Sequence, residues 1–172
     1  MRRTSFASMQ CSLARSLEVI GDWWTPLIIR SLFLGVTRFD DLIEDLGVSR
    51  NLLTSRLKAL VEHGLIERRR YQDHPPRHDH VLTKAGRELV PPLIALTAWG
   101  DRWATPRGGS PLLFEHRGCG HQFVPQLRCS HCGEAVGPDD VIARPGPGGR
   151  AVRGTRVVAR RLLEAARRTE HF

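Results

Sequence analysis

The stretch GVSRNLLTSRLKALVEHGLIERRR, residues 47–70, constrains the fold of this chain more than any other. Its apolar residues recur at the three- and four-residue spacing of one helix face: Leu53, Leu57, Leu60 and Val61. At about 100° per residue, a polar set lies on or beside the opposite face: Asn51, Thr54, Ser55, Arg56 and Lys58. Ser49 stands where an N-cap is expected. The stretch therefore predicts an amphipathic helix with one buried side.

The neighbouring segments extend this helix into a recognisable motif. RFDDLIEDLG, residues 38–47, predicts a shorter helix that ends at Gly47, and two helices joined by a tight turn form a helix-turn-helix. LIERRRY and HDHVL, residues 65–71 and 78–82, predict a hairpin whose tip carries two prolines, which a central strand would exclude. A basic hairpin at this position is a wing. We interpret its histidines as solvated: His74, His78 and His80.

Three further helices are expected around this motif. The first covers CSLARSLEVI and ends at Gly21, and the second, residues 25–35, has Thr25 as its cap, Pro26 in its first turn and apolar residues nearly all round. Thr83 caps a longer helix, residues 84–104, which two central prolines should kink. Beyond them an apolar strip follows, which predicts a dimer interface: Leu93, Leu96, Trp99 and Trp103.

The charge of the chain favours a polyanionic partner. The formal net charge is +8 with a pI near 10.5, and arginine supplies nearly all of it, a side chain suited to phosphate and guanine. The simpler alternative is a solvated helix beside a basic edge hairpin, but the combined motif favours DNA binding. We expect contacts to double-stranded DNA from these residues: Arg38, Ser49, Arg50, Asn51, Thr54, Ser55, Arg56, Lys58, Arg68, Arg69, Arg70 and Arg77.

The ordered landmarks of residues 11–104 resemble those of the HxlR-type winged helix-turn-helix transcriptional regulators. The matching blocks are W-x-x-L-I-I-R-x-L, G-x-x-R-F-D-x-L, S-x-x-x-L-T-x-R-L-K-x-L-x-x-x-G-L-I-x-R, a Pro-Pro wing and L-T-x-x-G. The resemblance implies a dimeric bacterial repressor or activator, paired through the first and last helices of the domain. We expect it to bind an inverted-repeat operator and to answer to a small molecule or a thiol-modifying effector.

Cys11 begins the first predicted helix, where members of this family often carry a cysteine. In some members that thiol senses oxidants or electrophiles, so the resemblance makes Cys11 a candidate redox sensor. A helix N-terminus and Arg15, one turn along, would both favour the thiolate. The alternative is a small buried side chain without reactivity, as most free cysteines are.

A cysteine-bearing appendage follows the winged domain. Two half-motifs, H-x-x-C-G and C-x-x-C-G, predict a zinc-ribbon-like module with one structural zinc ion and four ligands: His116, Cys119, Cys129 and Cys132. His121 and His131 compete for the histidine position. The alternatives are unrelated thiols or a redox C-x-x-C, although the thioredoxin-like context of a redox motif is missing from the sequence.

These features together predict a mainly α (α+β) chain of three parts. Residues 1–104 form the winged helix-turn-helix and dimerisation domain, 105–144 the zinc-ribbon-like module, and 145–172 a linker and a basic terminal helix. No run has transmembrane length and no signal-type apolar stretch follows MRRTSFASMQ, so we expect a cytoplasmic protein. The rival hypothesis, a zinc- or thiol-dependent enzyme, lacks a nucleophile–base motif. We therefore expect no catalytic residues.

Overall fold

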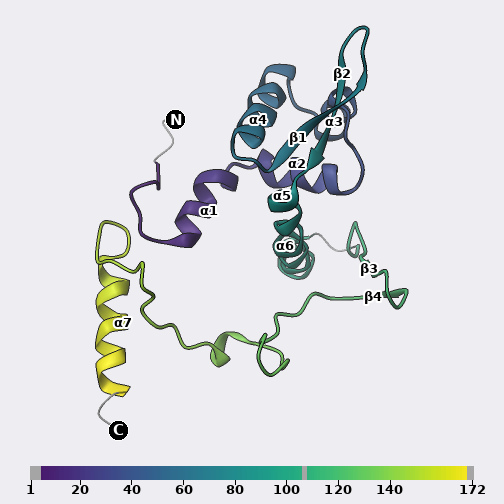
Figure 1. The fold of residues 1–172 in the computed structure, drawn as a ribbon. Coiled ribbons are helices and arrows are strands. Elements are labelled where there is room, and N and C mark those ends of the chain that lie inside the picture. The colour runs from purple at the N-terminus through teal and green to yellow at the C-terminus, as the bar shows by residue number, and fades with distance from the viewer. Residues whose placement is uncertain (1–4, 106–107, 170–172) are drawn as a thin grey trace. The chain divides into compact units, whose positions relative to one another are not determined.

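In the computed structural model, which describes residues 5–105 and 108–169, the chain forms two units (Figure 1). One unit is Trp23–Ala135, and the other combines Met1–Asp22 with Val136–Phe172. The first unit has the winged helix-turn-helix fold of helices with a small antiparallel sheet, as predicted. The domain boundaries expected after residues 104 and 144 stay predictions.

Helix α2 (Trp24–Phe33) supplies the centre of the core in the first unit. Ile28, Ile29 and Leu32 are buried, while Leu27 and Phe33 are exposed. The expectation of a helix buried on all sides was therefore wrong. The predicted cap was also wrong: the helix begins at Trp24, and Thr25 is buried inside its first turn. Because Thr25 already has helical neighbours on both sides, Trp23 occupies the capping position instead.

Helices α3 (Phe39–Leu46) and α4 (Arg50–Glu62) form the predicted helix-turn-helix. Gly47 ends α3 at a φ of 63°, a left-handed conformation that glycine adopts without strain. Ser49 caps α4, since its hydroxyl accepts a hydrogen bond from the Leu52 backbone N–H at 3.3 Å. Leu53, Leu57 and Leu60 are buried as expected, whereas Val61 is 38% exposed. The buried side of α4 thus ends at Leu60, one residue before the end that the sequence pattern suggested.

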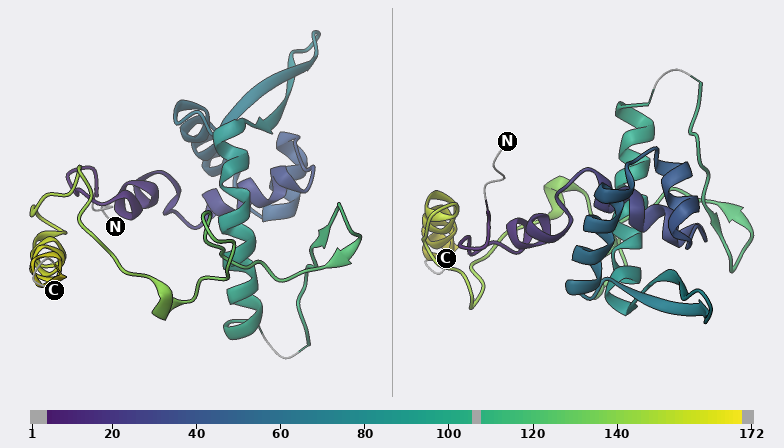
Figure 2. Two further views of the ribbon diagram at one scale, coloured as in Figure 1. Left: turned by 60° about the horizontal axis from the view of Figure 1, so that its bottom comes forward. Right: turned by 90° about the horizontal axis from the view of Figure 1, so that it is seen from above.

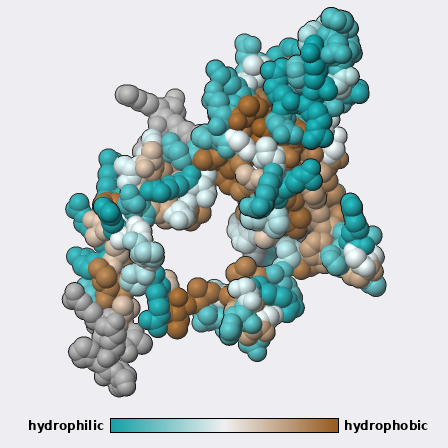
Figure 3. Space-filling model, viewed as in Figure 1, coloured by the Kyte–Doolittle hydropathy of each residue, from teal (hydrophilic) through white to brown (hydrophobic). Residues whose placement is uncertain are grey.

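The wing is an antiparallel hairpin of β1 (Ile66–Gln72) and β2 (Arg77–Leu82), as predicted. Ile66 pairs with Leu82 at its base, and both side chains are buried, which anchors the hairpin to the core. Its tip, residues 73–76, extends away from the helices (Figure 2). Hydrophilic residues cover this part of the surface (Figure 3).

The predicted long helix after the wing is two helices, α5 (Lys84–Glu88) and α6 (Val90–Trp103). Thr83 does cap α5, accepting a hydrogen bond from the Gly86 N–H at 3.2 Å. The chain breaks at Leu89 instead of kinking at the prolines. Pro91 and Pro92 fall in the first turn of α6, where a missing N–H costs no helical hydrogen bond.

The rest of the chain contains short elements and two further helices. In the first unit, β3 (Glu115–His116) and β4 (His121–Gln122) pair as a small hairpin. The second unit holds α1 (Ser12–Ile20), which ends at Gly21 as predicted, a short 3-10 helix, η1 (Pro138–Asp140), and the basic helix α7 (Arg156–Thr169). None of the helices in the described ranges is long and apolar enough to cross a membrane.

Candidate nucleic-acid interface

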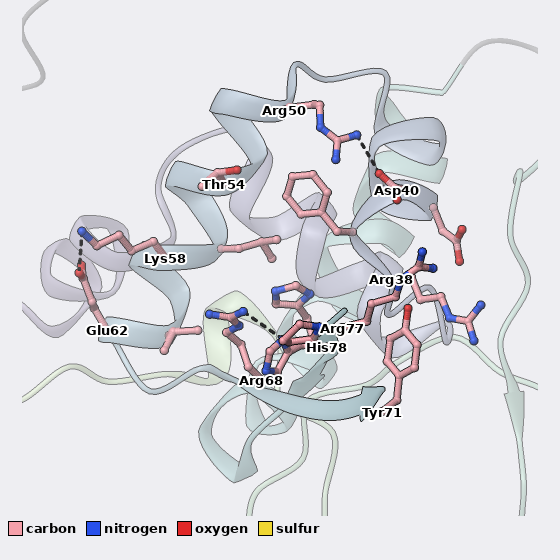
Figure 4. A pocket seen from close by; sticks show the side chains of 16 residues that line it. Arg38, Asp40, Arg50, Thr54, Lys58, Glu62, Arg68, Tyr71, Arg77 and His78 are labelled. Carbon is pink, nitrogen blue, oxygen red and sulfur yellow. Dashed lines mark hydrogen bonds and ion pairs between the residues drawn. The ribbon is translucent and has the colours of Figure 1, made fainter. Parts of the chain in front are cut away.

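A groove of about 850 Å³ lies between α4, the start of α3 and the wing (Figure 4). Helix α4 contributes Arg50, Thr54 and Lys58 to one wall. The opposite wall comes from the hairpin and from the residue before α3: Arg38, Arg68, Tyr71, Arg77 and His78. Basic side chains therefore enter one groove from three separate segments of the chain.

Aromatic rings support two of these arginines. The Arg38 guanidinium lies 5.0 Å from the centre of the Tyr71 ring, and that of Arg50 lies 5.0 Å from the centre of the Phe39 ring. Arg50 also forms an ion pair with Asp40 at 2.8 Å, between two largely exposed side chains. Exposed ion pairs contribute little stability, so a phosphate can replace the carboxylate at small cost. Both arginines are held at the groove, with their charges accessible.

The arginines of β1 point in different directions because side chains alternate along a strand. Arg68 lines the groove, with its Nη2 atom 3.1 Å from Nδ1 of His78. Arg69 instead pairs with Glu67 at 3.0 Å. Arg70 pairs with Asp73 at 3.0 Å and donates hydrogen bonds to backbone carbonyls at the tip. The three consecutive arginines thus have three different surroundings.

His80 is buried at the base of the wing, which makes our interpretation of it as a solvated residue wrong. Its side chain is 7% exposed, and its backbone N–H donates to the Thr37 carbonyl at 2.9 Å. The Nδ1 atom is buried without a hydrogen-bond partner among the described residues. Burial lowers the pKa of His80 and is the largest effect, and the backbone hydrogen bond with Thr37 opposes it. The charges of Arg68 and His78 lower the pKa a little further, and Asp79 has the smallest, raising, effect. The neutral imidazole is therefore the favoured form.

The structure divides the predicted DNA contacts into groups. Those that line the groove are Arg38, Arg50, Thr54, Lys58, Arg68 and Arg77. Asn51 and Ser55 are exposed on α4 outside this lining, and Ser49 is used as the cap. Arg56 is half-buried, with its Nε atom shielded from solvent. Arg69 and Arg70 do not line the groove.

Sequence reasoning missed the aromatic residues of the groove, Phe39 and Tyr71. A signal was present, because each directly follows an arginine in the chain, Arg38 and Arg70. Neither ring supports the arginine that precedes it in the chain, however: Arg38 stacks on Tyr71, and Arg50 stacks on Phe39. Only the three-dimensional arrangement reveals which arginine each ring supports.

The predicted metal ligands form two separate pairs. Nδ1 of His116 lies 3.3 Å from Sγ of Cys119, next to the β3–β4 hairpin. Hydrogen bonds from the Cys132 and His131 backbone and from the Cys132 side chain lower the pKa of Cys129. Within residues 5–105 and 108–169, no group of three or more His, Cys, Asp or Glu side chains is assembled for a metal. The fold does not bring the four predicted ligands into one cluster.

Cys11 is half-buried and occupies the N-cap position of α1. Its carbonyl accepts a hydrogen bond from the Arg15 N–H at 3.0 Å. The Arg15 guanidinium donates to Gln10 Oε1 at 3.2 Å, so its charge is directed to that amide. The position at the helix start agrees with expectation, while the role of the thiol stays a prediction.

Comparison with known proteins agrees with this architecture. Residues 19–107 match the family model described as HxlR-like helix-turn-helix. The HTH-type transcriptional regulator Rv3095 of Mycobacterium tuberculosis, itself uncharacterised, is 44% identical over 81% of this chain and 89% of its own length.

Solved structures give the same result. PA1607, a candidate transcription factor, is 33% identical, with a TM-score of 0.74 over 83% of this chain and 100% of its own. The reduced form of the redox regulator HypR is 27% identical, with a TM-score of 0.51 over 54% of this chain and 92% of its own. The helix-turn-helix, the wing and these similarities together show that the chain belongs to the HxlR-like helix-turn-helix family of transcriptional regulators.

Proposed function

We propose that this protein regulates transcription by binding an inverted-repeat operator as a homodimer, with α4 in the major groove and the wing on the backbone. Helix α4 has 13 residues, a length of about 20 Å, and fits the major groove of B-DNA as recognition helices do. Asn51 and Ser55 would contact base edges. The wing arginines would contact phosphates.

The groove between α4 and the wing is the observation that carries this proposal. Three of its arginines form no ion pair with a carboxylate in the described part of the chain: Arg38, Arg68 and Arg77. The pairs formed by Arg50 and Lys58 are exposed, so they can open when DNA phosphates approach. Phosphate contacts from these side chains would fix the position of α4 for base recognition.

Helix α6 supports the homodimer. Leu96, Trp99 and Trp103 are 57%, 58% and 70% exposed, and Leu93 is half-buried beside them. Such an apolar strip is unusual on a monomer's surface, and a two-fold interface would bury it. The family resemblance adds the N-terminal helix α1 to this interface. A two-fold dimer would present its recognition helices to half-sites about 34–36 Å apart.

Selection of bound fragments from genomic DNA by the full chain, followed by footprinting, tests the proposal. We expect an inverted repeat whose half-site centres are separated by about one helical turn, 10–10.5 base pairs, or a multiple of it. Recovery of unrelated fragments without a shared repeat would contradict sequence-specific binding. A single unrepeated site would contradict the two-fold arrangement.

Sedimentation of a Trp99→Arg variant tests the dimer separately. A buried charge without a partner should split the dimer at micromolar concentration. Ile142→Arg is the matched control, because Ile142 is 79% exposed and lies outside both the strip and the two cysteine turns. A Trp99→Arg protein that sediments like the wild-type dimer would exclude α6 from the interface.

Control by a small molecule or a thiol-modifying effector completes the proposal, with Cys11 as the candidate sensor. HypR, solved in reduced and oxidised forms, is a redox regulator, and Cys11 occupies the N-cap position of α1. Diamide should weaken operator binding by the wild type but leave the Cys11→Ser variant unaffected. Equal responses of both proteins would exclude Cys11 as the sensor.

A further inference from the structure

Two tight turns in the C-terminal part of the first unit have the same construction. In each, a ligand-type residue is followed three positions later by a cysteine and then by a glycine with positive φ, 68° at Gly120 and 77° at Gly133. The glycine N–H donates to the carbonyl of the first ligand-type residue at 2.8 Å in both turns. We propose that these turns are the halves of one structural zinc site, formed by His116, Cys119, Cys129 and Cys132 of the same chain.

The first turn already positions two zinc ligands. His116 Nδ1 and Cys119 Sγ lie 3.3 Å apart, close to the separation of about 3.5 Å between a nitrogen and a sulfur on one tetrahedral zinc ion. Gly118 makes this possible, since a Cβ atom there would lie 2.9 Å from the His116 ring. His121 is directed elsewhere, with its Nδ1 atom 2.7 Å from the Cys119 carbonyl oxygen. This geometry favours His116 over His121 as the histidine ligand.

The second turn brings the other two sulfur ligands together. A backbone hydrogen bond from Cys129 N–H to the Glu134 carbonyl, at 2.9 Å, and a bridge between Arg128 and Ala135 close the loop. The Arg128 guanidinium donates to the Gly133 carbonyl at 2.9 Å and holds the turn from outside. Backbone N–H groups directed at a thiolate are typical of zinc-binding cysteine turns. Each turn offers two ligands, and a structural zinc ion takes four.

The segment between the turns can allow them to meet. Residues 123–127 belong to no helix or strand, and the bridge between Arg128 and Ala135 begins only after them. Its apolar side chains are unburied, with Val124 75% and Leu127 72% exposed, as is Leu113 at 61%. These few side chains cannot build a core alone, and metal binding commonly supplies the folding free energy of such small modules. Closure on zinc would give these side chains a common interior.

Metal analysis of the full-length protein, purified with zinc supplied, tests the proposal. We expect about one zinc per chain, and X-ray absorption should show three sulfurs near 2.3 Å and one nitrogen near 2.0–2.1 Å. Cys129→Ser/Cys132→Ser and His116→Ala/Cys119→Ser should each abolish zinc binding, while operator binding by the winged domain persists. Cys11→Ser is the matched control and should keep the metal.

Three results would overturn the proposal: protein without zinc, zinc that survives the loss of either pair, or a shell with fewer than three sulfurs. The His121→Ala variant should retain zinc. Loss of zinc from His121→Ala together with retention of zinc by His116→Ala would contradict the ligand assignment. Co-expression of the two double variants should recover no zinc, because the site lies within one chain. Recovery would show instead that two chains share it.

Discussion

The guanidinium of Arg38 stacks over the ring of Tyr71 at 5.0 Å, and this contact joins the start of α3 to the wing. Arg38 precedes α3, and Tyr71 lies in β1, 33 positions further along the chain. The two residues belong to different elements of the helix-turn-helix and wing, and both line the same groove. The stack therefore fixes an arginine at the place where the wing and the recognition helix would meet DNA.

Removing this ring should weaken DNA binding modestly. An exposed cation–π contact contributes about 0.5–1 kcal/mol, so Tyr71→Ala should lower operator affinity by a factor of about 2–5. Tyr71→Phe keeps the ring and should bind nearly as the wild type does. Fluorescence anisotropy with a labelled operator measures both. Equal losses in the two variants would show that the hydroxyl, not the stack, matters.

The two wing arginines Arg68 and Arg69 should differ in their contribution to phosphate binding. Arg68 lines the groove, whereas Arg69 pairs with Glu67 on the other side of the strand. Arg68→Gln should reduce the slope of log affinity against log salt concentration by about 1. Arg69→Gln should change it far less. A larger slope change for Arg69 than for Arg68 would place the opposite face of the wing on the DNA.

Folding stability should depend on pH through His80. Because its pKa is lowered by burial, the unfolded chain binds a proton more readily than the folded one between the lowered value and the ordinary 6.5. His80 therefore does not reduce the free energy of unfolding above about pH 6.5, and this free energy should fall as the pH decreases below that value. Urea unfolding of the wild type at about pH 7.5 and 5.5 measures this loss.

Two variants separate His80 from other titrating groups. His80→Phe fills a similar volume without a titratable nitrogen, so its loss of stability between the two pH values should be smaller. His63→Asn, at the exposed C-cap of α4, should retain the wild-type dependence. The charged and titratable neighbours named above, Arg68, His78 and Asp79, are unchanged in both variants. An unaltered pH dependence in His80→Phe would remove His80 as its source.

The elements of the winged domain could be predicted because local signals agreed with one another. The leucine spacing of α4, the Ser49 cap, the left-handed Gly47 and the two prolines of the wing tip each act within a few residues of the chain. Errors arose where tertiary packing overrode such signals. Thr25 has a capping side chain but is buried, and His80 looks polar but anchors the wing.

The site was predictable in its charges and not in its geometry. The composition and the alternation of side chains along a strand indicated which arginines belong to the motif. They did not indicate that Arg38 stacks on Tyr71 or that Arg69 faces away from the groove. Those relationships depend on the strand register, with Arg68 opposite His80, and on the bulge between Arg70 and Gln72. A bulge of one residue redirects a side chain, and no local pattern in the sequence marks it.

The central claim is that the outer face of α4 distinguishes base sequence, and paired binding measurements on Asn51→Ala/Ser55→Ala test it most directly. Both side chains are exposed on α4 and make no hydrogen bond within the described residues, so their removal should leave the fold intact. Affinity for the selected operator should fall by about 1–3 kcal/mol per lost base contact, while affinity for a scrambled duplex at the same salt concentration stays unchanged. An equal loss on both duplexes, or no loss on either, would contradict the account.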